Sequence, residues 1–132
     1  DLSLSGSSYI NNQNALSGIT SKSGEAEFAV EAPEEGIYRF TFTYSNNEEG
    51  GYHAYNVDLV EEYFILTVNG ESQTVMCRNT YADDNLNTIT VNVKLKERTN
   101  EIKIFNDGSV KFADRLCTSP DIYSITVSKI NV

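Results

Sequence analysis

The single histidine of the chain, His53, is the residue around which acid–base or nucleophilic catalysis would have to be organised. Serine and cysteine nucleophiles are both activated by a neighbouring base, which in the common triads is histidine. His53 stands beside Tyr52 and Tyr55 in a polar stretch, which indicates a loop surface and not a buried catalytic pair. Motifs of the G-x-S-x-G, H-E-x-x-H and glycine-rich phosphate-loop types do not occur in the sequence. We therefore expect a protein that is not an enzyme.

Acidic residues are the other group that could do chemistry, since most glycosidases hold the sugar between two carboxyl groups. The chain has 19 Asp and Glu residues against 10 Lys and Arg, which gives a formal net charge of -9. With so many carboxylates, a close pair can arise by chance and does not indicate catalysis. The same charge repels phosphate backbones and anionic lipid, so we expect neither nucleic acid nor a membrane as a partner.

The two cysteines, Cys77 and Cys117, lack the C-x-x-C or Cys/His spacing of a zinc site. They can form one disulfide or remain two thiols, and the sequence leaves both arrangements open.

The elements that must position these side chains are β-strands, because apolar and polar residues alternate with a period of two. In residues 38–44 four aromatic residues alternate with polar ones, which predicts a strand with an aromatic core face. Residues 89–95 alternate in the same way. Further strands are expected at residues 25–30, 63–68, 72–78, 100–105 and 122–127.

Turn signals separate the strands. Asn69-Gly70 predicts a type I′ hairpin, and reversals are expected at residues 33–36, 96–100 and 106–108. The spacing predicts an all-β, single-domain antiparallel β-sandwich, jelly-roll-like, with about eight or more strands over residues 1–132. Residues 1–24 should wrap around it as short edge strands. Val57, Val60 and Phe64 have helical spacing, which allows a short helical turn before the strand at residue 63. Long polar segments at residues 45–62 and 106–120 are typical of functional loops.

Several segments share their order and spacing with a known family. Residues 36–40 have the pattern G-x-Y-x-hydrophobic, residues 44–46 follow as Y-x-N, and Val68-Asn69-Gly70 forms a hairpin. The strand of residues 88–95, the N-x-I pattern of residues 100–104 and the P-D-I pattern of residues 120–122 complete the series. Over residues 25–130 this series resembles the carbohydrate-binding modules of families 6 and 35.

The resemblance implies a non-catalytic, monomeric module, secreted or at the cell surface, that targets an attached bacterial glycoside hydrolase to galactose-type or uronic-acid sugars. The family's sugar site draws on regions corresponding here to residues 46–58, 79–86 and 106–121. Sugars stack on aromatic rings and bond to planar polar groups. The ring candidates are Tyr52, Tyr55 and Tyr81. The hydroxyl-binding candidates are His53, Asn79, Asn106 and Asp121. A uronic-acid carboxylate could be held by the guanidinium of Arg78 or Arg115.

The chain departs from the family at two places. It has no tryptophan, and the family's stacking position in the second loop falls near Asp83, with Leu86 at the next aromatic position. The family's structural calcium is held by a Glu-x-Glu pair and by an Asp of the closing motif. The given sequence starts after the position expected for the pair, and Tyr123 stands in place of the Asp. We therefore expect no required cofactor and an incomplete usual calcium site. A different calcium site would draw on Asp83, Asp84 or Asp107.

An alternative function also follows from the missing tryptophan. The chain could be a structural β-sandwich of a large glycosidase or adhesin, one that makes protein contacts and has no sugar site.

Overall fold

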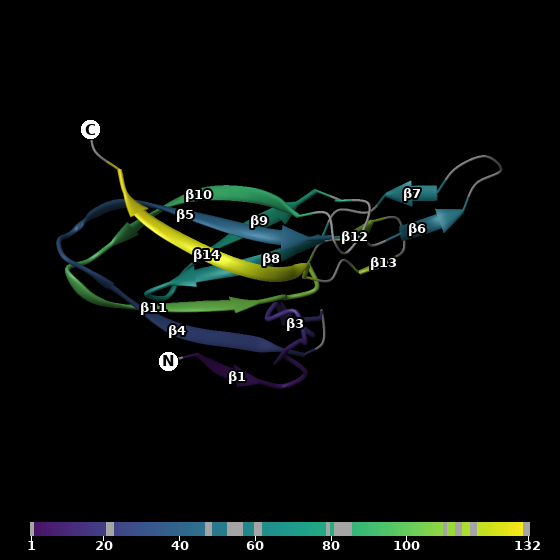
Figure 1. The fold of residues 1–132 in the computed structure, drawn as a ribbon, viewed down its shortest axis with the longest axis horizontal. Coiled ribbons are helices and arrows are strands. Elements are labelled where there is room, and N and C mark those ends of the chain that lie inside the picture. The colour runs from purple at the N-terminus through teal and green to yellow at the C-terminus, as the bar shows by residue number, and fades with distance from the viewer. Residues whose placement is uncertain are drawn as a thin grey trace.

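The computed structural model describes residues 2–20, 23–46, 49–52, 57–59, 62–78, 80, 86–109, 111–112, 115–116 and 119–130. Its strands form two five-stranded sheets that face each other as the layers of a sandwich (Figure 1). All pairings within the two sheets are antiparallel. The all-β sandwich expected from the alternation is thus confirmed. Within the described ranges, no helix has the length and apolar character needed to cross a membrane.

The first sheet has the strand order β1 (Ser3–Ser5), β4 (Glu25–Ala32), β11 (Arg98–Phe105), β8 (Glu62–Val68), β9 (Glu71–Cys77). The second sheet has the order β10 (Asn87–Leu95), β5 (Gly36–Ser45), β14 (Asp121–Lys129), β3 (Leu16–Ser17), β2 (Tyr9–Ile10). Two small hairpins complete the described strands, namely β6 (Glu49–Tyr52) with β7 (Val57–Leu59) and β12 (Lys111–Phe112) with β13 (Arg115–Leu116).

The core lies between the two sheets. The aromatic stripe of β5 faces inward as predicted, and Phe40 and Phe42 are both fully buried. The Phe42 ring meets Phe64 of the opposite sheet edge-on, with centroids 4.9 Å apart. Because β5 is flanked by β10 and β14, its alternate residues point outward on the other face of the second sheet. On the outer side of the first sheet, Tyr63 and Ile65 form a second, smaller buried cluster with Met76 and Phe105.

The hairpin between β8 and β9 turns at Asn69-Gly70. Asn69 has φ 50° and Gly70 has φ 88°, so both central residues are left-handed, as a type I′ turn requires. The side-chain oxygen of Asn69 also accepts a bond from the Glu101 backbone N–H at 2.8 Å. The predicted turn is therefore confirmed, and it is tied to β11.

Residues 2–20 wrap the side of the sandwich, as expected. β1 is the edge strand of the first sheet, and β2 with β3 forms the edge of the second. Elsewhere one alternative was wrong: Val57 begins the strand β7 and not a helical turn. Residues 62–68 form the extended strand β8.

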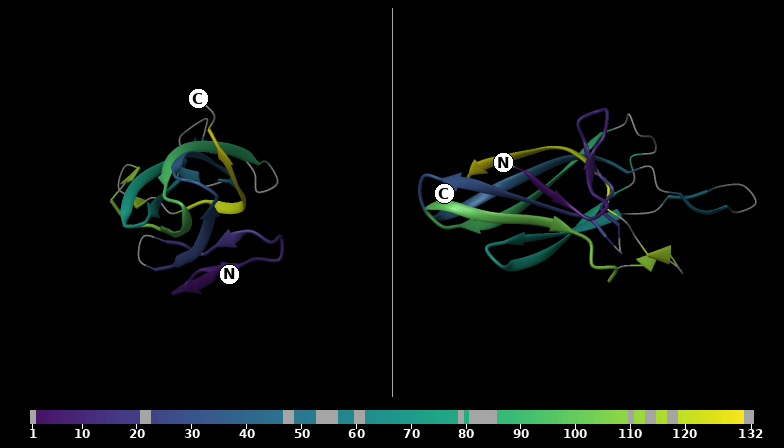
Figure 2. Two further views of the ribbon diagram at one scale, coloured as in Figure 1. Left: turned by 90° about the vertical axis from the view of Figure 1, so that its left-hand side faces the viewer. Right: turned by 90° about the horizontal axis from the view of Figure 1, so that it is seen from below.

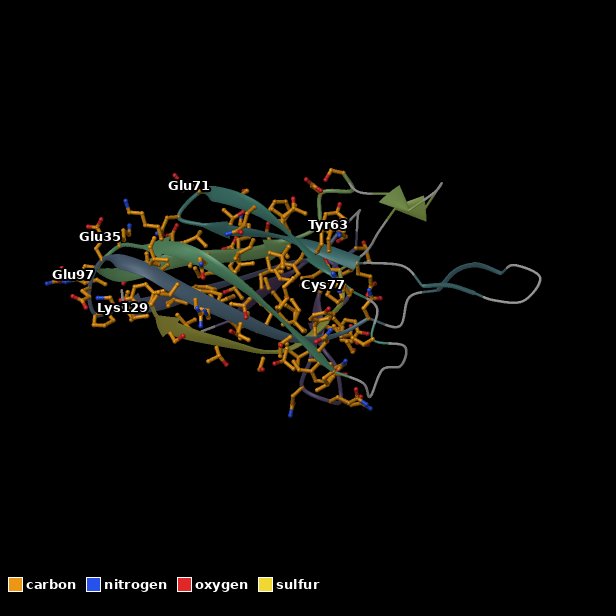
Figure 3. All side chains as sticks on the ribbon, turned by 90° about the horizontal axis from the view of Figure 1, so that it is seen from above. Glu35, Tyr63, Glu71, Cys77, Glu97 and Lys129 are labelled. Atoms are coloured by element: carbon orange, nitrogen blue, oxygen red, sulfur yellow. The ribbon has the colours of Figure 1, made fainter. Side chains whose placement is uncertain are left out.

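The two ends of the sandwich differ. At one end lie the short connections, near the labelled Glu35, Glu71 and Glu97 (Figure 3). The β6–β7 hairpin projects beyond the other end, where β12 and β13 also lie (Figure 2). Tyr63 and Cys77 lie toward this second end, which we call the loop end (Figure 3). Strands β5, β9 and β11 finish there, and β14 begins there.

Candidate functional site

Three clusters of hydrogen bonds anchor the three long loops at the loop end. Each cluster lies where a strand finishes or begins, and each combines residues that are distant in the sequence. Together they bring one described residue or more of each predicted region, namely Asn46, Thr80, Asn106 and Asp121, to one end of the sandwich.

The first cluster joins the end of β5 in the second sheet to the end of β9 in the first. Asn46 is 1% exposed, and its side-chain amide donates to the Cys77 carbonyl oxygen at 3.0 Å. Its backbone N–H donates to Thr80 Oγ1 at 2.9 Å, and the Thr80 N–H donates back to the Asn46 carbonyl at 2.6 Å. The Tyr44 hydroxyl donates to the Arg78 carbonyl at 3.0 Å. We call this set the β5–β9 clamp.

The clamp explains why the Y-x-N pattern occurs at this place. Tyr44 and Asn46 both stand on the core side at the end of β5, and both reach the opposite sheet. Burial is the main reason that the pKa of the Tyr44 hydroxyl is raised, so it stays a neutral donor. Arg78 lies between Cys77 and Thr80, which the clamp holds, and its side chain is exposed. No ion pair engages its guanidinium among the described residues.

The second cluster is the corner between β8 and β11. The Asn106 amide nitrogen donates to the Tyr63 carbonyl at 3.0 Å and to Ser119 Oγ at 3.3 Å. Ser119 Oγ itself donates to the same Tyr63 carbonyl at 2.9 Å. The Asn106 side-chain oxygen accepts from the Gly108 N–H at 2.9 Å. Asn106 is 8% exposed, so its amide serves as a buried anchor at the base of the third loop.

Asp107 continues this corner at the surface. Its Oδ1 accepts bonds from the Tyr63 hydroxyl at 2.9 Å and from the Ser109 N–H at 3.0 Å. Hydrogen bonds from Ser109 are the largest cause that holds the pKa of the Asp107 carboxyl below its ordinary value. The carboxylate is therefore charged and oriented by Tyr63 and Ser109, and among the described residues it belongs to no group of acidic ligands.

The third cluster surrounds Asp121, the first residue of β14. Its Oδ1 accepts a bond from Ser17 Oγ at 2.8 Å, and Ser17 Oγ accepts one from the Asn11 side-chain amide at 3.0 Å. Across the sheet Asp121 pairs with Ser45, which is 3% exposed. The Asp121 carboxylate thus sits in a partly buried polar group at the base of the loops.

Several predicted site residues lie outside the described residues, namely His53, Tyr55, Asn79, Tyr81, Asp83 and Asp84. Tyr52 is placed by its backbone, which pairs with Val57 in the projecting hairpin, and Arg115 of β13 pairs with Phe112 of β12. The structure places Arg78, Asn106 and Asp121 at the same end of the sandwich. Their sugar-binding roles, and those of the others, stay predictions.

The clusters include residues that the sequence analysis missed. Thr80, Ser17 and Ser119 all hold loop anchors in place. Nothing in their sequence surroundings distinguishes them from other hydroxyl residues, because the loop anchors that they hold lie 34, 104 and 56 residues away, respectively. In the sequence, Asn46 is only the last residue of the Y-x-N pattern. Its buried hydrogen bonds explain why an asparagine stands at that position.

The expectation that the family's usual calcium site is incomplete stays a prediction. At the position of the carboxylate in the closing motif, the Tyr123 hydroxyl donates to Gln13 Oε1 at 3.0 Å. No group of three or more His, Cys, Asp or Glu side chains gathers in the parts of the chain that the structure describes. Cys77 is buried, and Cys117, the other cysteine, lies outside the described residues.

Comparison with known proteins identifies the class of fold. No family model matches the chain, and no curated protein matches it either. Solved structures do match, and several of them are family 35 carbohydrate-binding modules. The sequence segments indicated a resemblance to families 6 and 35, and the structural likeness is to family 35 modules.

Three of these structures illustrate the likeness. A family 35 carbohydrate-binding module from Clostridium thermocellum has a TM-score of 0.74 and 21% identity, covering 96% of this chain and 91% of that one. The family 35 module of Abf62 from Cellvibrio japonicus has a TM-score of 0.68 and 17% identity, covering 99% of each chain. An exo-β-1,3-galactanase from Phanerochaete chrysosporium, solved with β-1,3-galactotriose, has a TM-score of 0.71 and 17% identity. Its match covers 96% of this chain but 27% of the galactanase.

Proposed function

We propose that this chain is a non-catalytic carbohydrate-binding module whose glycan site lies at the loop end. The observation that carries the proposal is the likeness to family 35 modules over nearly the whole chain, with a TM-score of up to 0.74. The three anchored loops at one end support it, because ligand sites commonly use loops held on a rigid scaffold. No cofactor enters the proposal.

The role we propose is to keep an attached glycoside hydrolase close to its polysaccharide. The galactanase match supports this role, because the module-like part makes up 27% of that enzyme. A site that binds weakly gains from such attachment, since linkage raises the effective concentration of the enzyme at its substrate. The role also places the protein outside the cell, where polysaccharides are found.

The sugar class we propose is galactose-type or uronic acid. The exposed Arg78 guanidinium at the clamp supports the second class, because arginine binds carboxylates through two parallel hydrogen bonds. The β-1,3-galactotriose bound by the galactanase supports the first. Substitution of Arg78 separates the two classes. Arg78→Ala should abolish binding of a glucuronic-acid ligand and leave binding of β-1,3-galactotriose within about twofold.

A glycan array, run with and without calcium, tests the proposed function. The wild-type protein should bind a defined group of oligosaccharides in both conditions, and calorimetry at millimolar sugar should confirm the hits. Tyr52→Ala and Asp121→Ala should each reduce that binding at least tenfold. Ile37→Ala is the control, since Ile37 is 44% exposed at the start of β5, at the end of the sandwich opposite the loops.

The same measurements can overturn the proposal. If the folded wild-type protein binds no glycan on the array or by calorimetry, the result would favour the alternative of a structural sandwich that makes protein contacts. Hydrolysis of a glycan that His53→Ala abolishes would show instead that the chain is an enzyme.

A further inference from the structure

The outer face of the second sheet carries a regular array of hydroxyl and amide side chains. Its rows run across strands β10, β5 and β14, and each row is set by the strand register. The first row is Thr88, Thr43 and Ser124, the second is Thr90, Thr41 and Thr126, and the third is Asn92, Arg39 and Ser128. We call these nine residues the hydroxyl face. All are exposed except Thr41 and Thr43, which are half-buried.

The hydroxyl face differs in charge from the outer face of the first sheet. The first sheet presents carboxylates around Lys103, whose Nζ lies 3.5 Å from both Glu25 and Glu27. Glu31 and Glu101 stand on the same side by strand alternation. The nine residues of the hydroxyl face include no acidic residue and one cation, Arg39, in a chain of net charge -9. Since both sheets need β-forming residues equally, β-propensity alone does not account for this difference.

A buried hydroxyl extends the same face toward the loop end. Ser45 follows Thr41 and Thr43 on the outward side of β5 and pairs with Asp121. It is 3% exposed, and its Oγ has no hydrogen-bond partner among the described residues. A buried hydroxyl without a partner is costly and usually bonds to a water or a ligand. The column of hydroxyls on β5 therefore leads from the hydroxyl face to the loop-end site.

We propose that the hydroxyl face is a second glycan-binding surface, one that holds an extended polysaccharide chain. The inference rests on the proposed function, because it assigns the length and class of the ligand. Neighbouring strands place hydroxyls about 4.8 Å apart, and alternate residues place them about 6.7 Å apart along each strand. A polymer of neutral sugars offers hydroxyls at similar repeating intervals and meets no acidic side chain on this face. The Thr41 and Thr90 hydroxyls lie 3.2 Å apart, so part of the array is already ordered.

This surface would bind polymers without aromatic stacking. Each hydrogen bond to a sugar replaces one to water and contributes little by itself. Affinity would then increase with the number of sugars in contact, and a short oligosaccharide held at the loop end would gain nothing from the face. Dependence on chain length is therefore the property that distinguishes the hydroxyl face from the loop-end site.

The test is native electrophoresis of the folded protein through gels that each contain one soluble neutral polysaccharide: β-1,3-galactan, β-1,4-xylan or β-1,4-mannan. The key variant is Thr41→Val/Thr90→Val/Thr126→Val, which removes one row of hydroxyls but keeps the β-branched shape. The matched control is Thr67→Val/Thr74→Val/Thr99→Val on the outer face of the first sheet. A second variant, Thr90→Glu/Thr126→Glu, adds negative charge at two exposed positions. It shows whether a loss of binding is specific to the face or is caused by the valine substitutions themselves.

We expect at least one polysaccharide to retard the wild-type protein. The affinity for that polysaccharide, obtained from the retardation, should be higher than the affinity for its own trisaccharide in solution. Both face variants should weaken retardation by that polysaccharide about tenfold, as expected from losing a few neutral hydrogen bonds, while the control triple variant stays within twofold. Trisaccharide binding by calorimetry should be unchanged in the face variants and lost in Tyr52→Ala.

The failures of the two proposals can be told apart. Retardation of the face variants equal to that of wild type, or a polysaccharide bound no better than its trisaccharide, overturns the hydroxyl face and leaves the loop-end site standing. Retardation that depends on the face in a protein that binds no short sugar supports the face and overturns the loop-end site. No binding to any polymer or oligosaccharide overturns both.

Discussion

The side-chain amide of Asn46 donates to the backbone carbonyl of Cys77 at 3.0 Å, which joins two strands that lie in different sheets. Asn46 follows the last residue of β5, and Cys77 is the last residue of β9. Because both residues are at most 1% exposed, the bond is shielded from water. The two sheets are therefore held together by polar bonds at the loop end, in addition to the apolar core.

Substitution of Asn46 should destabilise the protein. Asn46→Ala leaves the Cys77 carbonyl without its amide donor in a buried place, and we expect a loss of about 1–3 kcal/mol in the free energy of unfolding. Urea denaturation followed by circular dichroism measures the loss. Asn92→Ala is the control, because Asn92 is exposed and should change stability by less than about 0.5 kcal/mol. Equal stability of the two variants would show that the clamp contributes nothing.

The fold could be predicted from the sequence because its signals are local. The alternation in residues 38–44 indicated the inward stripe of β5, and Asn69-Gly70 indicated the turn between β8 and β9. Each of these features depends on residues within a few positions of one another. The apparent helical spacing of Val57, Val60 and Phe64 misled for the same reason, since a three-residue coincidence carries no information about sheet pairing.

The candidate site was harder to predict because its anchors join distant parts of the chain. Ser17 bonds to Asp121 across 104 residues, and Thr80 bonds to Asn46 across 34. The sequence contains no pattern that pairs a serine near residue 17 with a carboxylate near the opposite terminus. Asn106 was predicted to bind a sugar hydroxyl, and that role stays a prediction; the sequence did not indicate that its amide also bonds to Tyr63 and Ser119 in a buried corner. A residue type suited to sugar hydroxyls is equally suited to backbone carbonyls.

The contact between Phe42 and Phe64 should be among the most sensitive in the core. Both rings are fully buried, and they meet edge-on across the two sheets. Phe42→Ala should cost about 3–5 kcal/mol, because it removes a large side chain and leaves a cavity. Ile37→Ala provides the comparison on the same strand, since Ile37 is 44% exposed and its truncation should cost far less. Similar unfolding midpoints in urea for the two variants would contradict the packing described for β5.

Two glycines with positive φ should respond very differently to the same substitution. Gly70 has φ 88° and open space where a Cβ would lie, so Gly70→Ala should cost only the backbone strain of about 1–2 kcal/mol. Gly18 has φ 81°, but a Cβ there would lie 2.2 Å from the Ser7 carbonyl oxygen. Gly18→Ala should therefore cost about 1–3 kcal/mol more, through displacement of the N-terminal segment. Thermal unfolding of both variants in parallel checks this order, and a more stable Gly18→Ala would reverse it.

The carboxyl group of Asp107 should titrate below the ordinary pKa of about 3.9 for aspartic acid. Hydrogen bonds from Ser109 are the main cause, and the Tyr63 hydroxyl makes a smaller contribution. Ser109→Ala should raise the pKa measured by carboxyl-carbon NMR, and Tyr63→Phe should raise it less. Because folding lowers the pKa, the charged Asp107 stabilises the protein above the unfolded-state value, and this effect is lost as the pH falls through the folded-state value. The stability difference between wild type and Asp107→Asn should accordingly be constant near neutral pH and shrink only below about pH 4, whereas a difference that shrinks between about pH 5 and 7 would exclude Asp107 as its source.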